Sequence, residues 1–259
     1  QAGLYPGQLA GINIKKNKTR LKRTRINMHW APNFQKTGSN DYKTIGHVSL
    51  ENTKILKNAY YLSMAKTGRV KGYGEIDLQG KYEFYAGLPY FEYSSTMTFN
   101  ADAHLFLLRN NEMTLDKLFT HLIYPDPHGR LAEIPLYNDT HIDSLAKAPL
   151  ADDISWLGFI NKSMDYGLVG LTLDYDNQNK MGETSPLFEP HLKISKGRQE
   201  GRYWNRRLIH DHNVLVPEGS RYYEHNAYLI LDNLDDVDGQ IDHYIKCLKN
   251  PITVEYLTN

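Results

Sequence analysis

The sequence has almost no cysteine. Its 259 residues include only Cys247, which cannot form a disulfide within the chain or provide by itself the cysteines of a zinc site. The sequence also has no net charge, because 30 lysines and arginines balance 30 aspartates and glutamates. No strong overall field exists to attract nucleic acid. We therefore expect no nucleic-acid partner.

Long apolar runs and common catalytic motifs are missing as well. No segment approaches the roughly 20 apolar residues of a membrane-spanning helix, and the opening QAGLYPGQLA lacks the basic-then-apolar pattern of a signal peptide. The Walker, G-x-G-x-x-G, G-x-S-x-G and H-E-x-x-H motifs do not occur. We therefore expect no membrane partner and no nucleotide cofactor. The sequence also lacks the motifs that would indicate a common hydrolase mechanism.

Tyrosine is what the sequence has in excess. It contains 19 tyrosines with 3 tryptophans, 8 phenylalanines and 11 histidines, and its 41% hydrophobic content is ordinary for a globular protein. Tyrosine is enriched in β-strands, and exposed aromatic rings often bind sugars or bases by stacking. The composition therefore predicts a β-rich protein with a ligand cleft.

Alternating side chains predict a succession of strands. Between residues 90 and 99, apolar or small side chains alternate with polar ones, which is the period of a strand. Similar alternation predicts two preceding antiparallel strands and several later ones. The expected strands cover residues 56–64, 76–84, 90–99, 154–161, 167–175, 208–216 and 227–231.

Helix signals occur at two places. Thr114 is a suitable N-cap, and it precedes apolar residues spaced i, i+3, i+4 and i+7, namely Leu115, Leu118, Phe119 and Leu122. The same spacing recurs after Asp238 and ends at Asn250-Pro251. No linker or repeat divides the chain. The sequence therefore predicts an all-β fold, a large antiparallel β-sandwich with two short helices, formed by residues 1–259 as a single domain.

The polar segment around His210 and His212 is the first candidate site. In a strand, these two residues would face the same side and could present both imidazoles to one divalent metal ion, Zn or Ca. Glu224 and His225 could complete the ligand set. The alternative is that both histidines are ordinary surface or hydrogen-bonded residues.

Three further clusters have the chemistry of a binding site. Arg109, Asn111 and Glu112 sit together where a strand is expected to end, and they could bind a carboxylate or sugar hydroxyls. Tyr222 and Tyr223 lie close to a histidine, which is a plausible acid/base pairing, although adjacent strand residues face opposite ways. The third cluster is a possible stacking wall, formed by His29 and Trp30.

Several segments resemble the strands of galactose-mutarotase-like super-β-sandwich domains. The similar segments are residues 82–91 leading into 95–99, residues 156–159 with 167–175, and the closing residues 219–228. Such domains occur in aldose epimerases and in many polysaccharide lyases. The resemblance covers about two thirds of the chain and implies a super-sandwich fold and a carbohydrate ligand.

Three functional hypotheses follow. The first is a polysaccharide lyase cleaving a uronic-acid glycan by β-elimination, in which Arg109, Asn111 or a cation neutralises the carboxylate, His210 or His212 is the base, and Tyr222 or Tyr223 is the acid. The second is an epimerase-like enzyme using a histidine with a carboxylate such as Glu112 or Glu224. The third is a non-catalytic glycan-binding or interaction domain. For a glycan ligand we expect an extracellular or periplasmic location.

Overall fold

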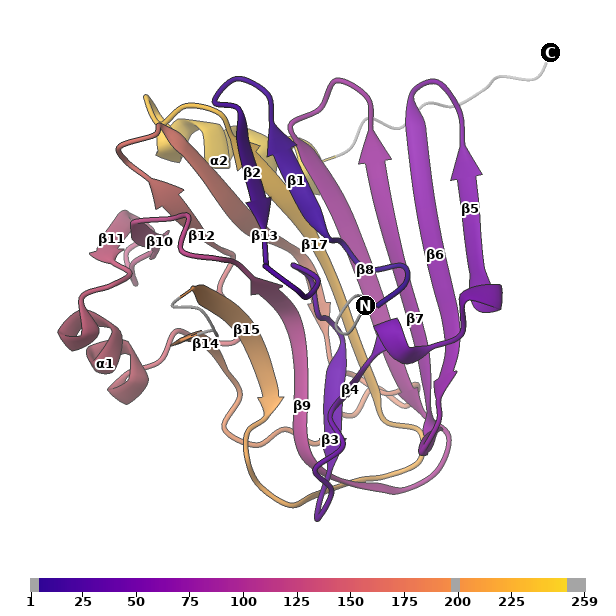
Figure 1. Cartoon of the computed structure of the whole chain (residues 1–259). Coiled ribbons are helices and arrows are strands. Elements are labelled where there is room, and N and C mark those ends of the chain that lie inside the picture. Colours follow the sequence, from indigo (N-terminus) through magenta and orange to yellow (C-terminus); the bar gives the residue numbers. More distant parts are fainter. Residues whose placement is uncertain (1–4, 197–200, 251–259) are drawn as a thin grey trace.

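Two large antiparallel sheets dominate the protein (Figure 1). The structure, a computed structural model, describes residues 5–196 and 201–250. Its strands are β1 (Gly11–Ile14), β2 (Thr19–Lys22), β3 (Asn33–Lys36), β4 (Lys43–Thr44), β5 (Thr53–Lys57), β6 (Tyr61–Val70), β7 (Tyr73–Tyr85), β8 (Tyr90–Phe99), β9 (Ala103–Thr114), β10 (His121–Pro125), β11 (Leu131–Pro135), β12 (Trp156–Asn161), β13 (Tyr166–Asp176), β14 (His191–Lys196), β15 (Arg202–Ile209), β16 (Val214–Val216) and β17 (Arg221–Leu231). The helices are α1 (Asp139–Lys147), α2 (Val237–Lys249) and the 3-10 turns η1 (Ile45–His47) and η2 (Leu50–Asn52).

The larger sheet has nine strands in the order β11-β10-β12-β13-β17-β8-β7-β6-β5. The smaller sheet has six strands, in the order β14-β15-β9-β3-β4 with β16 paired to β9. β1 and β2 form a separate hairpin. The predicted all-β sandwich is confirmed, because the strands are antiparallel and the two α-helices contain only 9 and 13 residues.

The core fills the space between the two sheets. Phe159 of the larger sheet meets Trp204 of the smaller sheet edge to face, with ring centroids 4.8 Å apart. A second cluster continues this layer, with Leu108 and Phe34 packed against Met97 and Tyr222. One face of the smaller sheet is covered in this way, which leaves its opposite face free for polar side chains.

Strand alternation was a reliable signal for the central hairpins. β8 buries every second residue, and its buried set is the one expected from residues 90–99. The strand expected at 56–64 is interrupted, because that range spans the turn between β5 and β6. The strand expected at 208–216 is also wrong. β15 ends at Ile209, and a turn in which Asp211 has a φ of 49° separates it from β16.

The helix expected after Thr114 is a second error. Leu115 and Phe119 lie in the loop after β9, while Leu122 belongs to β10. All three are buried, but backbone bonds to distant strands replace helical ones, as from Leu115 N to the Arg202 carbonyl at 3.2 Å. The periodicity thus predicted correctly that these residues are buried, but the helical backbone that it predicted is wrong.

The C-terminal helix is confirmed as α2, whose side chain Ile241 is buried. Pro251, expected to stop it, lies outside the described residues. Helix α1 was not expected. Its N-cap is Asn138, whose side chain accepts from His141 N, and its apolar residues Ile142 and Leu145 are only partly buried against the core. Among the described residues, no helix is long and apolar enough to cross a membrane.

Candidate functional site

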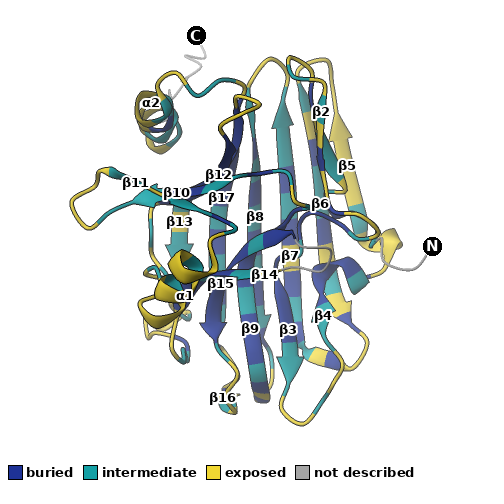
Figure 2. Ribbon diagram, turned by 60° about the vertical axis from the view of Figure 1, so that its left-hand side comes forward, coloured by how far each residue is buried: buried dark blue, intermediate teal, exposed yellow. Residues whose placement is uncertain are grey.

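A polar cleft lies on the face of the smaller sheet that points away from the core. Strand β15 shows how this face is formed, because its side chains alternate. Trp204 and Arg206 point to the larger sheet, where Arg206 forms an ion pair with Glu224 of β17. Tyr203, Asn205 and Arg207 therefore point the other way. Figure 2 shows this sheet with α1 beside β14.

An irregularity in β9 adds two charged side chains to the same face. Opposite Asn205, the register of β9 shifts between Asn110 and Met113, so that two residues of β9 oppose one of β15. Asn111 has a φ of 45°, and its side-chain oxygen accepts from Trp204 Nε1 at 3.1 Å and from the Tyr228 hydroxyl at 3.0 Å, inside the core. This β-bulge puts Arg109 and Glu112 on one face, although residues three apart normally face opposite sides of a strand.

Glu112 is held at the base of the cleft. Its Oε2 accepts from Asn33 Nδ2 and from Asn205 Nδ2, both at 3.2 Å, and lies 3.9 Å from Arg109 Nη1. Burial raises the pKa of the Glu112 carboxyl above its usual value, while the nearby Arg109 opposes that shift. A buried carboxyl group with a raised pKa is a candidate for proton transfer to or from a ligand.

Aromatic side chains surround Glu112. They line a cavity of about 490 Å³ together with Arg109 and Glu112, and they are Tyr5, Trp30, Tyr42 and Tyr203. Trp30 lies edge to face with Tyr5, at a centroid distance of 5.1 Å. Burial and Glu112 raise the pKa of the Tyr42 hydroxyl well above its usual value, so Tyr42 keeps its proton. The cavity therefore combines stacking surfaces with hydroxyl donors.

Three cations form a line across the sheet, which we call the cationic strip: Lys193 of β14, Arg207 of β15 and Arg109 of β9. Arg207 pairs in register with Arg109, and Lys193 pairs with the neighbouring Asn205. Desolvation and the nearby Arg109 lower the pKa of Arg207 to about 10. Desolvation and Arg207 also lower the pKa of Lys193. Mutual repulsion among cations favours an anionic ligand.

Several buried polar atoms along this face have no hydrogen-bond partner within the described part of the chain. They are Arg109 Nε, Asn33 Oδ1 and Ser195 Oγ. Ser195 pairs in register with Tyr203 and so belongs to the same face. Unpaired buried polar groups are costly, and a polar ligand in the cleft would supply partners for them.

The expected metal ligands are not brought together. His210 and His212 lie in the turn between β15 and β16, not on one strand face, because β15 ends before them. The His212 ring stacks on Phe188 at a centroid distance of 3.9 Å, while His210 accepts from Arg207. Among the described residues, no group of three or more histidine, cysteine, aspartate or glutamate side chains is arranged to hold a metal ion.

Glu224 and His225 lie on opposite faces of β17. Glu224 is buried with Arg206 between the sheets, and His225 Nε2 is 2.8 Å from the Glu92 carboxylate on the outer face of the larger sheet. Neither residue reaches the turn that holds His210. Their expected shared site is therefore not formed by this arrangement of the chain.

Tyr222 and Tyr223 face opposite ways, as the sequence predicted, but neither joins the cleft. The Tyr222 hydroxyl donates to the Pro186 carbonyl inside the core, at 2.6 Å. Tyr223 lies on the outer face of the larger sheet, beside Thr96. Neither can act on a ligand held by Arg109.

His29 and Asn111 are core residues. The His29 ring is fully buried, with the Tyr82 hydroxyl at 2.6 Å and the Tyr228 hydroxyl at 3.2 Å. Burial lowers the pKa of His29 to about 3. Of the expected set, the structure thus places Arg109, Glu112 and Trp30 together in the cleft.

Sequence reasoning missed four important residues of the cleft: Tyr42, Lys193, Tyr203 and Arg207. Tyr203, Asn205 and Arg207 alternate with apolar Trp204 and Leu208, but the charged Arg206 between them breaks the pattern, so the signal for a polar strand face was only partial. Lys193 joins the cleft through the pairing of β14 with β15 and of β15 with β9, and Tyr42 precedes β4, whose partner β3 pairs with β9. A local pattern does not show these long-range pairings.

No family model and no curated protein matches the sequence. Among solved structures, the chain is similar to a TPR-domain containing protein from Parabacteroides distasonis, with a TM-score of 0.50, 12% identity, and coverage of 88% of this chain and 44% of that one. This similarity shows the fold alone. The chain spans less than half the length of that protein.

Two further similarities are weaker. A protein from Klebsiella pneumoniae assigned as an aldose 1-epimerase matches with a TM-score of 0.46, 12% identity, and coverage of 86% of this chain and 65% of that one. The α-N-acetylgalactosaminidase NagBb from Bifidobacterium bifidum matches with a TM-score of 0.48, 6% identity, and coverage of 83% and 32%. None of these three structures is a polysaccharide lyase.

Proposed function

We propose that this protein binds an acidic carbohydrate in the cleft of the smaller sheet and acts on it by proton transfer next to the sugar carboxylate. The observation that supports this most is the cationic strip beside the protonatable Glu112, at the base of an aromatic cavity. Arginine binds a carboxylate through a planar pair of donors, and aromatic rings stack on sugar rings.

The chemistry that fits this arrangement is β-elimination. Arg109 and Arg207 would neutralise the uronate carboxylate, which acidifies the proton on C5. Ionised Glu112 would take that proton, the C5–H electron pair would form the C4–C5 double bond, and the glycosidic oxygen on C4 would leave with a proton from Tyr203 or Tyr42. These assignments replace His210, Tyr222 and Tyr223, which the structure places elsewhere.

An epimerase-like reaction is the second candidate. Its first step is the same proton removal by Glu112, followed by return of a proton to the carbon and no bond cleavage. The raised pKa of Glu112 favours this reaction equally. The third hypothesis, a non-catalytic domain, needs only the binding part of the cleft.

One assay separates these outcomes. Alginate, polygalacturonate and hyaluronan are incubated with the protein in heavy water, with and without chelator, and are followed by ultraviolet absorbance, proton NMR and calorimetry. An unsaturated, absorbing product indicates a lyase, and deuterium at C5 without cleavage indicates an epimerase. Binding without either change indicates a binding domain. Absence of binding to all three polymers would overturn the proposal.

The chelator arm also tests the expected divalent ion. If turnover depends on Zn or Ca, the protein binds a divalent ion, and the ion lies at a site other than the one first expected at His210, His212, Glu224 and His225. An extracellular or periplasmic location remains a prediction, and it fits a glycan ligand.

A further inference from the structure

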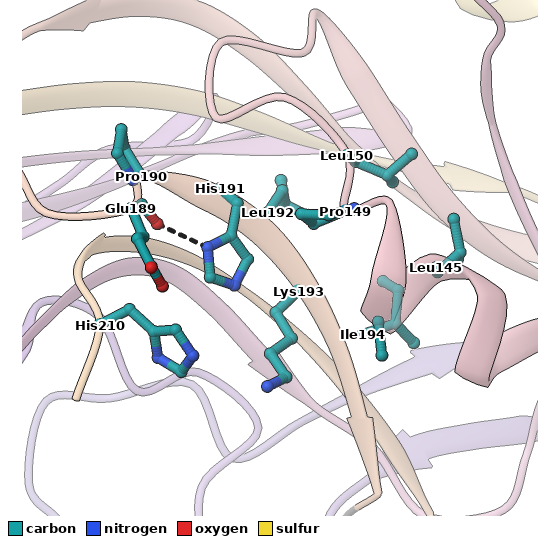
Figure 3. A pocket seen from close by; sticks show the side chains of 11 residues that line it. Leu145, Pro149, Leu150, Glu189, Pro190, His191, Leu192, Lys193, Ile194 and His210 are labelled. Carbon is teal, nitrogen blue, oxygen red and sulfur yellow. Dashed lines mark hydrogen bonds between the residues drawn. The ribbon is translucent and has the colours of Figure 1, made fainter.

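A second cavity, of about 390 Å³, lies at the other end of the cationic strip (Figure 3). Its polar floor is formed by His191 and Lys193 of β14 and by His210 after β15. Its apolar wall comes from Leu145 of α1, from Pro149 and Leu150 after that helix, and from Ile194 of β14. In Figure 3, the two imidazoles and the lysine side chain point into the same space.

The hydrogen bonds fix what each imidazole offers to a ligand. His191 Nδ1 donates to the Glu189 carbonyl at 2.6 Å, so the Nε2 of a neutral His191 is left as an acceptor. His210 Nδ1 accepts from the Arg207 guanidinium, so its Nε2 must carry the proton and is left as a donor. The rings lie edge to face, 4.9 Å between centroids.

Both imidazoles are neutral at ordinary pH. Burial lowers the pKa of His191, and burial together with Arg207 lowers the pKa of His210 to about 4. The cavity thus presents one neutral acceptor, one neutral donor and the ammonium group of Lys193. Neighbouring sugar hydroxyls need an acceptor and a donor, and an acidic substituent needs the cation.

The position of this cavity sets the size of the ligand. His191 pairs with Arg207, and Arg207 pairs with Arg109, so β14 and β9 are two strand spacings apart. Two spacings are roughly 10 Å, which is more than one sugar ring spans. A single sugar that stacks in the aromatic cavity at Glu112 and reaches Arg109 and Arg207 only with its carboxylate would therefore leave the second cavity empty, and a neighbouring unit of the same chain would reach it.

We infer that the cavity of His191, Lys193 and His210 is a second sugar subsite, and that the ligand is an acidic oligosaccharide of at least two units. The imidazoles bind hydroxyls of the second unit, Lys193 binds its acidic group, and the Leu145 and Leu150 wall packs against its apolar face. This inference rests on the proposed function, which places the first unit at Arg109 and Glu112.

The test compares chain lengths by calorimetry. The probes are galacturonate and tetragalacturonate, with mannuronate and its tetramer from alginate as a second series, at about 0.15 M salt to screen distant charges. Wild-type protein should bind a tetramer more tightly than the matching monomer. His191→Phe should weaken tetramer binding about ten-fold and leave monomer binding unchanged, whereas Lys193→Ala, in the cationic strip, should weaken tetramer binding more than monomer binding.

Matched controls are available for both variants. Lys54→Ala removes an exposed lysine of β5, and His212→Phe replaces an exposed imidazole outside the cavity. Neither should alter binding. Equal losses for monomer and tetramer, or no loss in either variant, would overturn the second subsite while the proposed function stands. Wild-type protein that binds neither length in either series would refute the proposed function and the subsite with it.

Discussion

Replacing Glu224 with leucine should strongly destabilise the protein, because Arg206 would lose its counter-charge inside the core. The two side chains are 0% and 1% exposed. Arg206 also donates to Thr172 Oγ1 at 2.9 Å and to the Asp152 carbonyl, and it lies over the Tyr175 ring at 4.5 Å. These neutral partners orient the guanidinium, and the carboxylates of Asp152 and Asp153 offset only part of its charge from further away.

The size of the effect follows from the cost of an uncompensated buried charge. Breaking a buried ion pair by removing one partner costs roughly 3 to 5 kcal/mol. A domain of this size loses roughly 2 to 4 °C in melting temperature per kcal/mol. We therefore expect the Glu224→Leu variant to melt roughly 6 to 20 °C below the wild type.

Urea unfolding and thermal melting followed by circular dichroism measure this change. The double variant Arg206→Met with Glu224→Leu removes both charges and should recover much of the lost stability, since a buried pair often contributes little beyond an apolar pair of similar volume. Asp242→Asn breaks an exposed ion pair with Lys246 and serves as the control, with no measurable change expected. The reasoning fails if Glu224→Leu melts with the wild type, or if the double variant is as unstable as the single one.

Three further predictions concern the cleft and the core. Arg109→Lys should weaken galacturonate binding, measured by calorimetry, about ten-fold, because lysine cannot form the planar pair of hydrogen bonds to a carboxylate. An unchanged affinity would indicate that the carboxylate binds elsewhere. Affinity for galacturonate should fall as pH rises through the raised pKa of Glu112, because the ionised carboxylate repels the ligand. Glu112→Gln should flatten that profile and abolish turnover while retaining binding, and a pH profile that Glu112→Gln leaves unaltered would contradict this. The pKa of His29 is lowered to about 3. As the pH falls below about 6.5, the imidazole takes up its proton in the unfolded chain before it does so in the folded protein. The contribution of His29 to stability is therefore complete above about pH 6.5 and is lost as the pH decreases toward 3. His29→Phe should reduce the slope of urea stability against pH in this window, whereas His141→Phe on the surface of α1 should not; equal slopes in all three proteins would rule out this role.

Local periodicity predicted the strands that have one buried face. β8 was identified because its residues alternate over its whole length and every second one is buried. The segment after Thr114 was misread for a related reason. Leu115, Phe119 and Leu122 are buried as expected, but they belong to a loop and a strand. Backbone hydrogen bonds with distant strands form there in place of the helix that the spacing predicted.

The candidate site was only partly readable, because it combines local chemistry with long-range pairing. Arg109 and Glu112 were recognisable as a cluster, and Trp30 as a stacking residue. Their partners Arg207 and Lys193 arrive from strands about 90 residues further along the chain through the β9, β15 and β14 pairing. His210 and His212 were misassigned because the sequence around them has strand composition, while the positive φ of Asp211 ends the strand.

The bulge in β9 links the stability of the core to the geometry of the cleft. Asn111 adopts a left-handed conformation that is unfavourable for most residues other than glycine, and its amide oxygen is held by Trp204 and Tyr228 between the sheets. Those core bonds keep the extra residue in place, and the extra residue turns Glu112 to the same face as Arg109. Without it, Glu112 would point between the sheets, on the face of Trp204 and Arg206 and away from Arg109. Glu112 and Arg109 therefore share a face of the sheet because Trp204 and Tyr228, on the other face, hold the Asn111 amide in the bulge.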